Sequence, residues 1–345
     1  MLYVTTRVSG DAFTAFRALS ENRGPEGGFF VPMYMPSYSR EEIARLANQP
    51  FSQNVAEILN LFFGTKLSGY DVELVIGRYP VRQVSLNGRL TVANAWNNPR
   101  QRFDRLVTGL EKAIRQSDQV NEVPSDWFMT ASRIAILFAL WGQLHQDKVI
   151  TTYQKIDIAV PNGDFSALMA AWYARSMGLP IETIICCCTE NNGIWNLFHK
   201  GTIRTDVPVL RTYTPACDYA VPADLERLIF ALSSVEEARR FCDICRIGGT
   251  YEVEDALLER LREGIHVRVV GSKQVASVIP NLYKISGYVA DPYTALSYGG
   301  LMDYRAVTGS GRHSLIISEE SPLFSFEYVC RCMNIEPTEL KLKLE

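Results

Sequence analysis

Short apolar runs separated by helical patterns dominate the second half of the chain. The runs are IDIAV, TIICCC, PVLRT and SLIIS, which begin at residues 156, 183, 208 and 314. Such continuous runs are typical of strands that are covered on both faces in a parallel sheet. We therefore predict an α/β fold with a mostly parallel, doubly wound sheet. In such a fold, ligand sites lie at the carboxyl ends of the strands.

Helices are marked by their caps and by the spacing of apolar residues. Ser39 and Glu42 form a capping-box pattern before REEIARLANQ, and NVAEILNLFFG repeats the helical spacing. Residues 131–144 are apolar nearly all round, which predicts a helix buried on most faces. Further helices are expected over 167–177 and after Asp291, where Asp-Pro is a helix-start pattern.

The chain of 345 residues is longer than one compact core usually needs. A polar stretch rich in arginine and asparagine, LNGRLTVANAWNNPRQRFDRL, begins at residue 86. We interpret it as a boundary between a small, mainly helical N-terminal lobe over residues 1–88 and an α/β core over residues 89–345.

Charge and hydropathy exclude two classes of partner. The net charge is −3, and the sequence carries no basic stripe, so a nucleic-acid partner is not expected. No apolar stretch reaches membrane-spanning length without interruption, and the first residues do not form an apolar leader. We predict a cytoplasmic protein that does not interact with membranes.

The eight cysteines do not form a metal-ligand pattern. Cys186, Cys187 and Cys188 are consecutive in a predicted strand, so their side chains point to alternating faces and cannot make one ligand set. Cys242 and Cys245 have CxxC spacing, but they lie in a predicted helix with no second pair at zinc-ribbon distance. No metal site is predicted.

The stretch VPNGDFSALMAAWYARSMGLP, residues 160–180, combines a strand end, a glycine turn and a helix start. Backbone N–H groups converge at such a turn and favour an anion. Asp164 lies inside it, and its carboxylate would oppose a dianionic phosphate by about 1 to 4 kcal/mol at roughly 4 Å. A simpler interpretation is that Asp164 is the helix N-cap, so that the protein's own carboxylate fills the anion site.

Five ordered blocks resemble threonine synthase, the pyridoxal-phosphate enzyme that makes threonine from O-phosphohomoserine in amino-acid biosynthesis. The blocks are TAFRALSENRGPEGGFFVP, VPNGDFSALMAAWYARSMGLPI, TPACDYAVPADLERLIF, SGYVADPYTALSYG and SLIISEESPLFSFEYV. They extend over almost the whole chain. The resemblance implies the fold-type II pyridoxal-phosphate fold, which is also called tryptophan-synthase-β-like.

The position of the family's catalytic lysine differs. In the family, a lysine after a phenylalanine forms the Schiff base with the cofactor, and in the matching stretch NAWNNPRQRFDRLVTG its place is taken by Asp104. A carboxylate cannot form an imine. Lys112 follows eight residues later, roughly 12 Å further along a helix. We therefore expect no catalytic residue and no bound cofactor.

A lobe of the family is also expected to be missing. Only residues 105–126 separate Asp104 from Trp127, whereas a single βαβ unit takes roughly thirty residues. The resemblance therefore implies that the small cofactor-domain lobe is largely deleted between about 105 and 126. Met129 stands where the family has an arginine. The uncovered face could bind a partner protein or a second copy of the chain.

The family's cofactor positions are degenerate here. Asp164 and Ser166 replace an asparagine and a second glycine of the phosphate loop, and Glu319 corresponds to the polar residue that meets the cofactor's ring nitrogen. Carried over by the resemblance, the cofactor-binding positions are Asn162, Gly163, Asp164, Phe165, Ser166 and Glu319.

Two functions remain open. The first is a pseudoenzyme retained for binding, regulation or scaffolding. The second is an enzyme, either a threonine-synthase-like lyase that uses pyridoxal phosphate and a lysine from elsewhere, or a new activity in the remodelled cleft. Its acid and base would come from Asp104, Asp164, Glu319 and Glu320, because clustered carboxylates can differ in pKa.

The charged candidates also have simpler interpretations. Glu319 and Glu320 could be a solvated turn before a proline. Arg100, Arg102 and Arg105 could bind an acidic ligand, or they could be the solvated face of a helix start.

Overall fold

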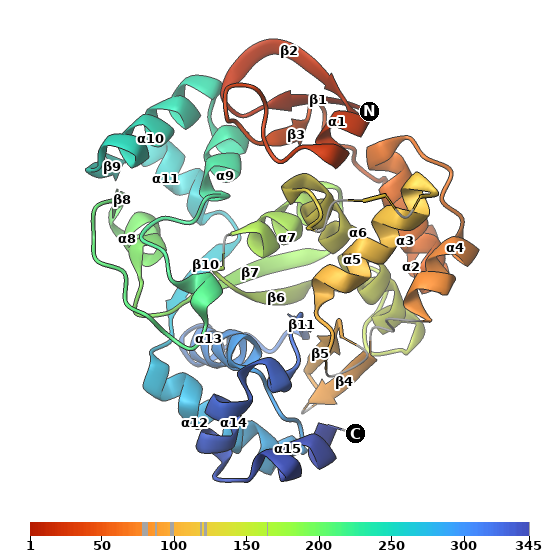
Figure 1. Cartoon of the computed structure of the whole chain (residues 1–345), viewed down its shortest axis with the longest axis vertical. Coiled ribbons are helices and arrows are strands. Elements are labelled where there is room, and N and C mark those ends of the chain that lie inside the picture. The colour runs from red at the N-terminus through yellow and green to blue at the C-terminus, as the bar shows by residue number, and fades with distance from the viewer. Residues whose placement is uncertain are drawn as a thin grey trace.

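The computed structural model describes residues 1–77, 82–86, 88–96, 100–117, 119–120, 123–163 and 165–344. A six-stranded sheet of order β10-β7-β6-β11-β5-β4 forms its centre (Figure 1). The strands are β4 (Arg82–Leu86), β5 (Leu90–Asn94), β6 (Ile156–Pro161), β7 (Ile181–Cys188), β10 (Ile265–Val269) and β11 (Ser314–Ser318). Only β4 pairs antiparallel within this sheet. The predicted α/β fold with a mostly parallel sheet is confirmed.

Helices cover both faces of this sheet, as the continuous apolar runs require. Helices α6 (Asp126–Gln146) and α7 (Ser166–Ser176) lie on one side, and α12 (Ser272–Ser286) and α13 (Pro292–Thr308) lie on the other (Figure 1). In β7, Cys186 and Cys188 belong to the first core and Cys187 to the second, and all three are fully buried. These cysteines therefore act as small apolar residues on alternating faces.

The predicted helices form, although the one expected over residues 131–144 extends from Asp126 to Gln146. Helix α6 is long and apolar enough to cross a membrane by length and composition alone, but most of it is buried inside the fold, so it is a core helix. Helix α7 ends before Gly178, whose φ of 104° favours glycine. Asp291 caps α13 by accepting hydrogen bonds from the backbone N–H groups of Tyr293 (2.8 Å) and Thr294 (3.1 Å).

The N-terminal part begins with a small antiparallel sheet that the sequence did not predict. Its strand order is β2-β1-β3. The elements are β1 (Leu2–Thr5), β2 (Val8–Thr14), α1 (Ala15–Ser20), β3 (Phe30–Pro32), α2 (Arg40–Ala47), α3 (Phe51–Phe63) and α4 (Gly69–Ile76). The predicted capping box of α2 is present, because Ser39 and Glu42 exchange backbone-to-side-chain hydrogen bonds of 3.2 and 2.7 Å.

The proposed boundary at residues 88 and 89 lies in the turn of the β4–β5 hairpin. Strand β5 pairs in parallel with β11, and every residue of β5 is buried. The polar stretch around it therefore contains a central strand of the main sheet, and the sheet has a strand on each side of the proposed boundary.

Helix α5 (Phe103–Arg115) is joined to α6 by residues 116–125. The described residues of this connection hold no helix or strand. A connection this short cannot contain a βαβ unit. The chain therefore passes directly from α5 to the central helix α6. Whether relatives carry a lobe at this point stays a prediction from the resemblance.

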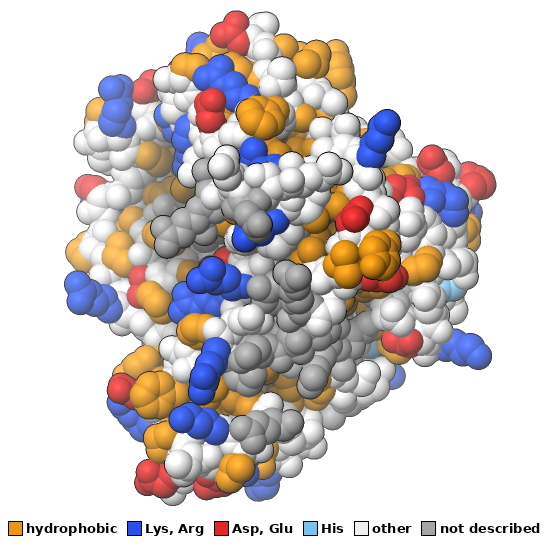
Figure 2. All heavy atoms as spheres, turned by 45° about the vertical axis from the view of Figure 1, so that its right-hand side comes forward, with side chains coloured by type: hydrophobic (Ala, Val, Ile, Leu, Met, Phe, Trp, Pro, Cys, Tyr) orange, Lys and Arg blue, Asp and Glu red, His pale blue; other side chains and the backbone are white. Residues whose placement is uncertain are grey.

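The remaining elements complete both sides of the molecule. They are α8 (Gly193–Lys200), β8 (Thr202–Arg204), α9 (Leu225–Leu232), α10 (Val235–Ile247), β9 (Thr250–Glu252), α11 (Asp255–Arg262), α14 (Phe326–Met333), α15 (Pro337–Leu344) and two short 3-10 helices, Pro215–Cys217 and Pro322–Ser325. On the face shown in Figure 2, basic and acidic side chains are interspersed, in line with the small net charge.

The predicted strand PVLRT is wrong, because residues 208–212 lie outside any strand. The side chain of Asn191 pairs with both backbone groups of Leu210, at 2.8 Å each. The backbone N–H of Thr212 donates to Asp218 (2.8 Å). These backbone groups are thus paired with side chains, and the apolar Val209 and Leu210 are exposed.

A buried arginine ties the N-terminal sheet to α6 and α9. The side chain of Arg227 is fully buried and pairs with Asp224, and its Nε donates to the carbonyl of Phe30 (3.3 Å). Its guanidinium lies 4.1 Å from the ring centroid of Phe29 and 5.8 Å from that of Trp127. A charge buried this deeply is tolerated only when it is paired.

Replacing Arg227 should destabilise the whole fold. Arg227→Met preserves much of the apolar volume but leaves Asp224 without its buried cation, so we expect a loss of about 3 kcal/mol in the free energy of unfolding. Urea denaturation followed by circular dichroism measures it. The control is Arg246→Met, which removes an exposed pair with Asp243 and should change stability by less than about 0.5 kcal/mol. Equal effects would contradict this role of Arg227.

Candidate functional site

A cavity of about 350 Å³ lies where the carboxyl ends of β6 and β11 meet the first turns of α5 and α7. This is the edge at which parallel sheets place ligand sites. Its apolar wall includes Phe103, Met129, Leu137, Ile158, Val160 and Ile317. Its charged residues are Arg102, Asp104, Arg133, Glu319 and Glu320.

The structure brings most of the predicted site residues together. Asp104, Asn162, Gly163, Ser166 and Glu319 all line this cavity. Phe165 is fully buried beneath the turn. Asp164 lies outside the described residues.

The turn between β6 and α7 has a strained backbone. Phe165 has a φ of 79°, which is uncommon for a residue other than glycine, and Gly163 has a φ of 45°. The backbone N–H of Phe165 donates to the carbonyl of Asn162 (2.7 Å). Helix α7 begins at Ser166 with Phe165 at the N-cap position and without a side-chain cap from it. The expected capping of α7 by Asp164 falls outside the described residues and stays a prediction.

Asn162 is a residue of the cavity lining and has a buried polar atom in its side chain. The residue is 1% exposed, and its backbone N–H donates to the carbonyl of Cys187 (2.8 Å). Its side-chain Oδ1 has no hydrogen-bond partner. An unpaired buried acceptor of this kind costs about 1 to 3 kcal/mol, so a ligand that donates a hydrogen bond would stabilise it.

Asp104 lies in the first turn of α5, at the position that the resemblance assigned to a lysine. Its side chain is exposed at the cavity, and the described residues give its carboxylate no hydrogen bond or ion pair. The helix dipole stabilises a negative charge in a first turn. Asp104 therefore places a carboxylate at the cavity, where the resemblance calls for a lysine.

Arg133 was missed by the sequence analysis. It lies one helical turn after Met129 on α6 and is largely buried, with 14% of its side chain exposed. Its Nε and Nη2 donate to the two carboxylate oxygens of Glu319 at 2.6 and 2.7 Å, and its Nη1 donates to Ser166 Oγ at 3.0 Å. The sequence does contain a signal for Arg133: it is the one Asp, Glu, Lys or Arg between Asp126 and Asp147, in a mostly apolar helix.

Glu320 pairs with Arg102 at 2.7 Å, and the two residues also form an isolated β-bridge. The Arg102 guanidinium lies 4.3 Å from the ring centroid of Phe324. Only 15% of the Glu320 side chain is exposed, so the interpretation of Glu319 and Glu320 as a solvated turn is wrong. Burial raises the pKa of Glu320 to about 7, and the carboxylates of Asp291 and Asp104 add to this rise while Arg102 opposes it.

The other cationic candidates lie elsewhere. Arg105 and Lys112 line a different hollow beside α4, and Arg100 is exposed on the surface. Of the three arginines proposed for an acidic ligand, only Arg102 reaches the cavity, and it is already paired. Among the described residues, no group of His, Cys, Asp or Glu could hold a metal ion.

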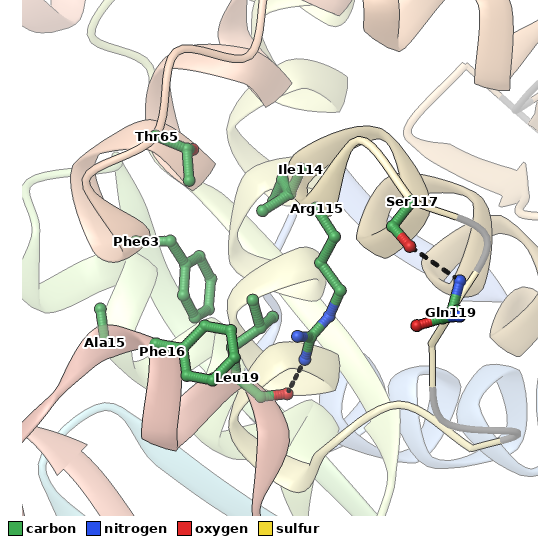
Figure 3. A pocket seen from close by; sticks show the side chains of 9 residues that line it. All are labelled: Ala15, Phe16, Leu19, Phe63, Thr65, Ile114, Arg115, Ser117 and Gln119. Carbon is green, nitrogen blue, oxygen red and sulfur yellow. Dashed lines mark hydrogen bonds between the residues drawn. The ribbon is translucent and has the colours of Figure 1, made fainter.

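A second hollow of about 410 Å³ lies beside the connection at 116–125 (Figure 3). Phe16, Phe63 and Ile114 supply apolar walls, and Phe16 is 68% exposed. Arg115 spans the hollow's edge, with Nη2 3.3 Å from the carbonyl of Leu19. Among the described residues that line this hollow, Arg115 is the titratable side chain, so the hollow is a weaker candidate for chemistry.

Comparisons with known proteins agree with the resemblance. Residues 2–78 match the family model named Threonine synthase N terminus. Threonine synthase-like 1 of Homo sapiens is 26% identical over 216 residues, or 56% of this chain and 28% of the relative. Threonine synthase of Pseudomonas aeruginosa is 30% identical over 147 residues, or 42% of this chain and 31% of the relative. The chain is therefore similar to the threonine synthases over part of its length.

Solved structures show that the threonine synthase fold is retained. The PLP-bound threonine synthase of Brucella melitensis superposes with a TM-score of 0.83 at 16% identity, covering 98% of this chain and 92% of that chain. The yeast threonine synthase gives a TM-score of 0.81, also at 16% identity, covering 99% and 93%. The two curated relatives named above are matched over less than a third of their length.

The raised pKa of Glu320 predicts a pH-dependent stability. Between the pKa of an ordinary unfolded glutamate, about 4.5, and about 7, the folded protein retains a proton that the unfolded chain has lost. The stabilisation is therefore full below that window and is lost as the pH rises through it, by at most about 3 kcal/mol. Urea unfolding at pH values on either side of the window measures this loss. Glu320→Gln should lose less stability than the wild type, and equal losses would contradict the assignment.

Proposed function

We propose that this chain uses the threonine synthase fold to bind a small molecule, in a regulatory or scaffold role, without Schiff-base catalysis. The observation that supports this most strongly is the place of Asp104. An acid lies in the cavity, on the first turn of α5, where the resemblance calls for the amine that holds the cofactor. Ligand binding in the cavity would remain possible without that amine.

The residues present do not fit pyridoxal phosphate held as a Schiff base. Among its described residues, the cavity lining contains Arg102 and Arg133 but no lysine. Lys112 lines the separate hollow beside α4. A covalent imine needs an amine nitrogen, which neither a guanidinium nor a carboxylate supplies in its place.

The groups that would meet the cofactor's two ends are bound to one another instead. The Arg133 side chain connects Ser166, in the turn resembling the phosphate loop, with Glu319, the position resembling the ring-nitrogen partner. An anion entering at Ser166 would have to compete with the carboxylate of Glu319 for the same guanidinium. This internal pairing further supports the loss of the cofactor.

A second candidate is an acid–base enzyme in the same cavity, which includes a threonine-synthase-like lyase. The observation in its favour is the pKa of Glu320, because a carboxyl that titrates near pH 7 can both give and take a proton in neutral solution. Arg102 is paired with this carboxylate and would set its orientation.

The proposed location and interface come from the sequence alone. We propose a cytoplasmic protein whose partner, or whose second copy, covers the face beside residues 116–125.

Labelling with pyridoxal phosphate tests the loss of Schiff-base chemistry. Wild-type protein is mixed with one equivalent of pyridoxal phosphate, reduced with borohydride and mapped by mass spectrometry. We expect only partial labelling spread over surface lysines. Asp104→Lys should gain one preferred labelled position at 104, because it returns an amine to the cavity. The control is Arg105→Lys, which places an amine at the next residue, in the hollow beside α4. It should gain no preferred labelled position. Full labelling of one wild-type lysine would overturn the proposal.

A further inference from the structure

The charges around the cavity do not cancel. Its described lining contains two guanidinium groups and three carboxylates. Arg133 is paired with Glu319 at 2.6 Å, and Arg102 is paired with Glu320 at 2.7 Å. The remaining charge is the carboxylate of Asp104. The cavity can therefore accept one positive charge without leaving any of these ion pairs unmatched.

The hydrogen-bonding groups of the cavity show the same imbalance. The Oδ1 of Asn162 is a buried acceptor without a donor, and the carboxylate of Asp104 is an acceptor without a donor among the described residues. The three bonded nitrogens of Arg133 are already used by Glu319 and Ser166. The unmet need of the cavity is thus for donors, which an anionic ligand does not supply.

We propose that the cavity binds a small primary amine in its ammonium form that also carries a second hydrogen-bond donor. The ammonium group pairs with Asp104, the second donor meets Oδ1 of Asn162, and the body of the ligand packs on the apolar wall. This inference rests on the proposed function and names the class of ligand for it. A volume of about 350 Å³ is within the range of small-molecule sites.

The groups around Asp104 should make the affinity for the amine depend on pH. The groups that act on Glu320 are Arg102 and Asp104 from the start of α5, and Asp291 and Tyr293 from the start of α13. An ammonium group at Asp104 adds a positive charge near Glu320, which favours the ionised carboxylate. By linkage, binding of the amine should strengthen as the pH rises through about 7.

The N-terminus of α7 is the feature that favours the opposite charge. Its first N–H groups attract anions. However, the Arg133 guanidinium that donates to Ser166 through Nη1 is paired with Glu319 through Nε and Nη2, and the sequence has Asp164 next to Gly163. An anionic ligand is therefore the competing outcome that the experiment must be able to detect.

Four probes separate these possibilities in calorimetric titrations of the whole chain. Tyramine, tyrosol and para-hydroxyphenylacetate share a phenol ring and its donor, and they end in an ammonium, a hydroxyl and a carboxylate. Phenethylamine retains the ammonium and lacks the phenol donor. We expect tyramine to bind about tenfold more tightly than tyrosol, because one charge-assisted hydrogen bond is gained. Tyramine should also bind more tightly than phenethylamine, and more tightly at pH 8 than at pH 6.

Asp104→Asn should abolish the preference for tyramine over tyrosol. The matched control, Asp243→Asn, removes an exposed acid on α10 and should retain this preference. Failure of tyramine to bind, equal binding of the alcohol, tighter binding of the carboxylate, or a preference that survives Asp104→Asn would each overturn the inference. These failures leave the proposed function intact, because it fails only when one wild-type lysine is fully labelled by pyridoxal phosphate.

Discussion

The ion pair between Arg133 and Glu319 is the constraint on which the cavity depends. A guanidinium that is mostly buried in an apolar helix must be paired, because an unpaired charge there would cost several kcal/mol. Its bidentate contact fixes the end of β11, and its third nitrogen fixes Ser166 at the start of α7. One side chain thus holds three elements in the positions that shape the cavity.

This pair also decides the chemistry of the site. Because Glu319 and Glu320 each have an arginine, Asp104 is left as the charge that the described residues do not balance. The start of α5 stabilises that charge through the helix dipole. The same fold that carries a cofactor in the Brucella melitensis enzyme therefore presents acceptor groups in this chain. On our proposal, an acid at position 104 and the ion pair between Arg133 and Glu319 are enough to set the class of ligand.

The rest of the molecule supports this arrangement through α6. The helix lies against α7 and the sheet, and Trp127 in its first turn donates to the hydroxyl of Tyr3 in β1 at 3.0 Å. The buried Arg227 adds a contact with the same tryptophan and with β3 through Phe30. The N-terminal sheet is therefore fastened to the helix that carries Arg133, and the short connection at 116–125 delivers the chain directly to that helix.

The sequence by itself determined the layers of the fold and one side of the site. The continuous apolar runs predicted β6, β7 and β11, the all-round apolar pattern predicted α6, and the resemblance assigned Asp104 to the site. Local patterns could not predict that PVLRT lies outside any strand, because its backbone pairs with the side chains of Asn191 and Asp218 from other segments. Local patterns also could not predict strand β5, because it is buried by pairing with β11, which lies more than two hundred residues away in the sequence. Arg133, Glu319 and Ser166 meet only in the folded chain, because ion pairing depends on distance in space and not along the sequence.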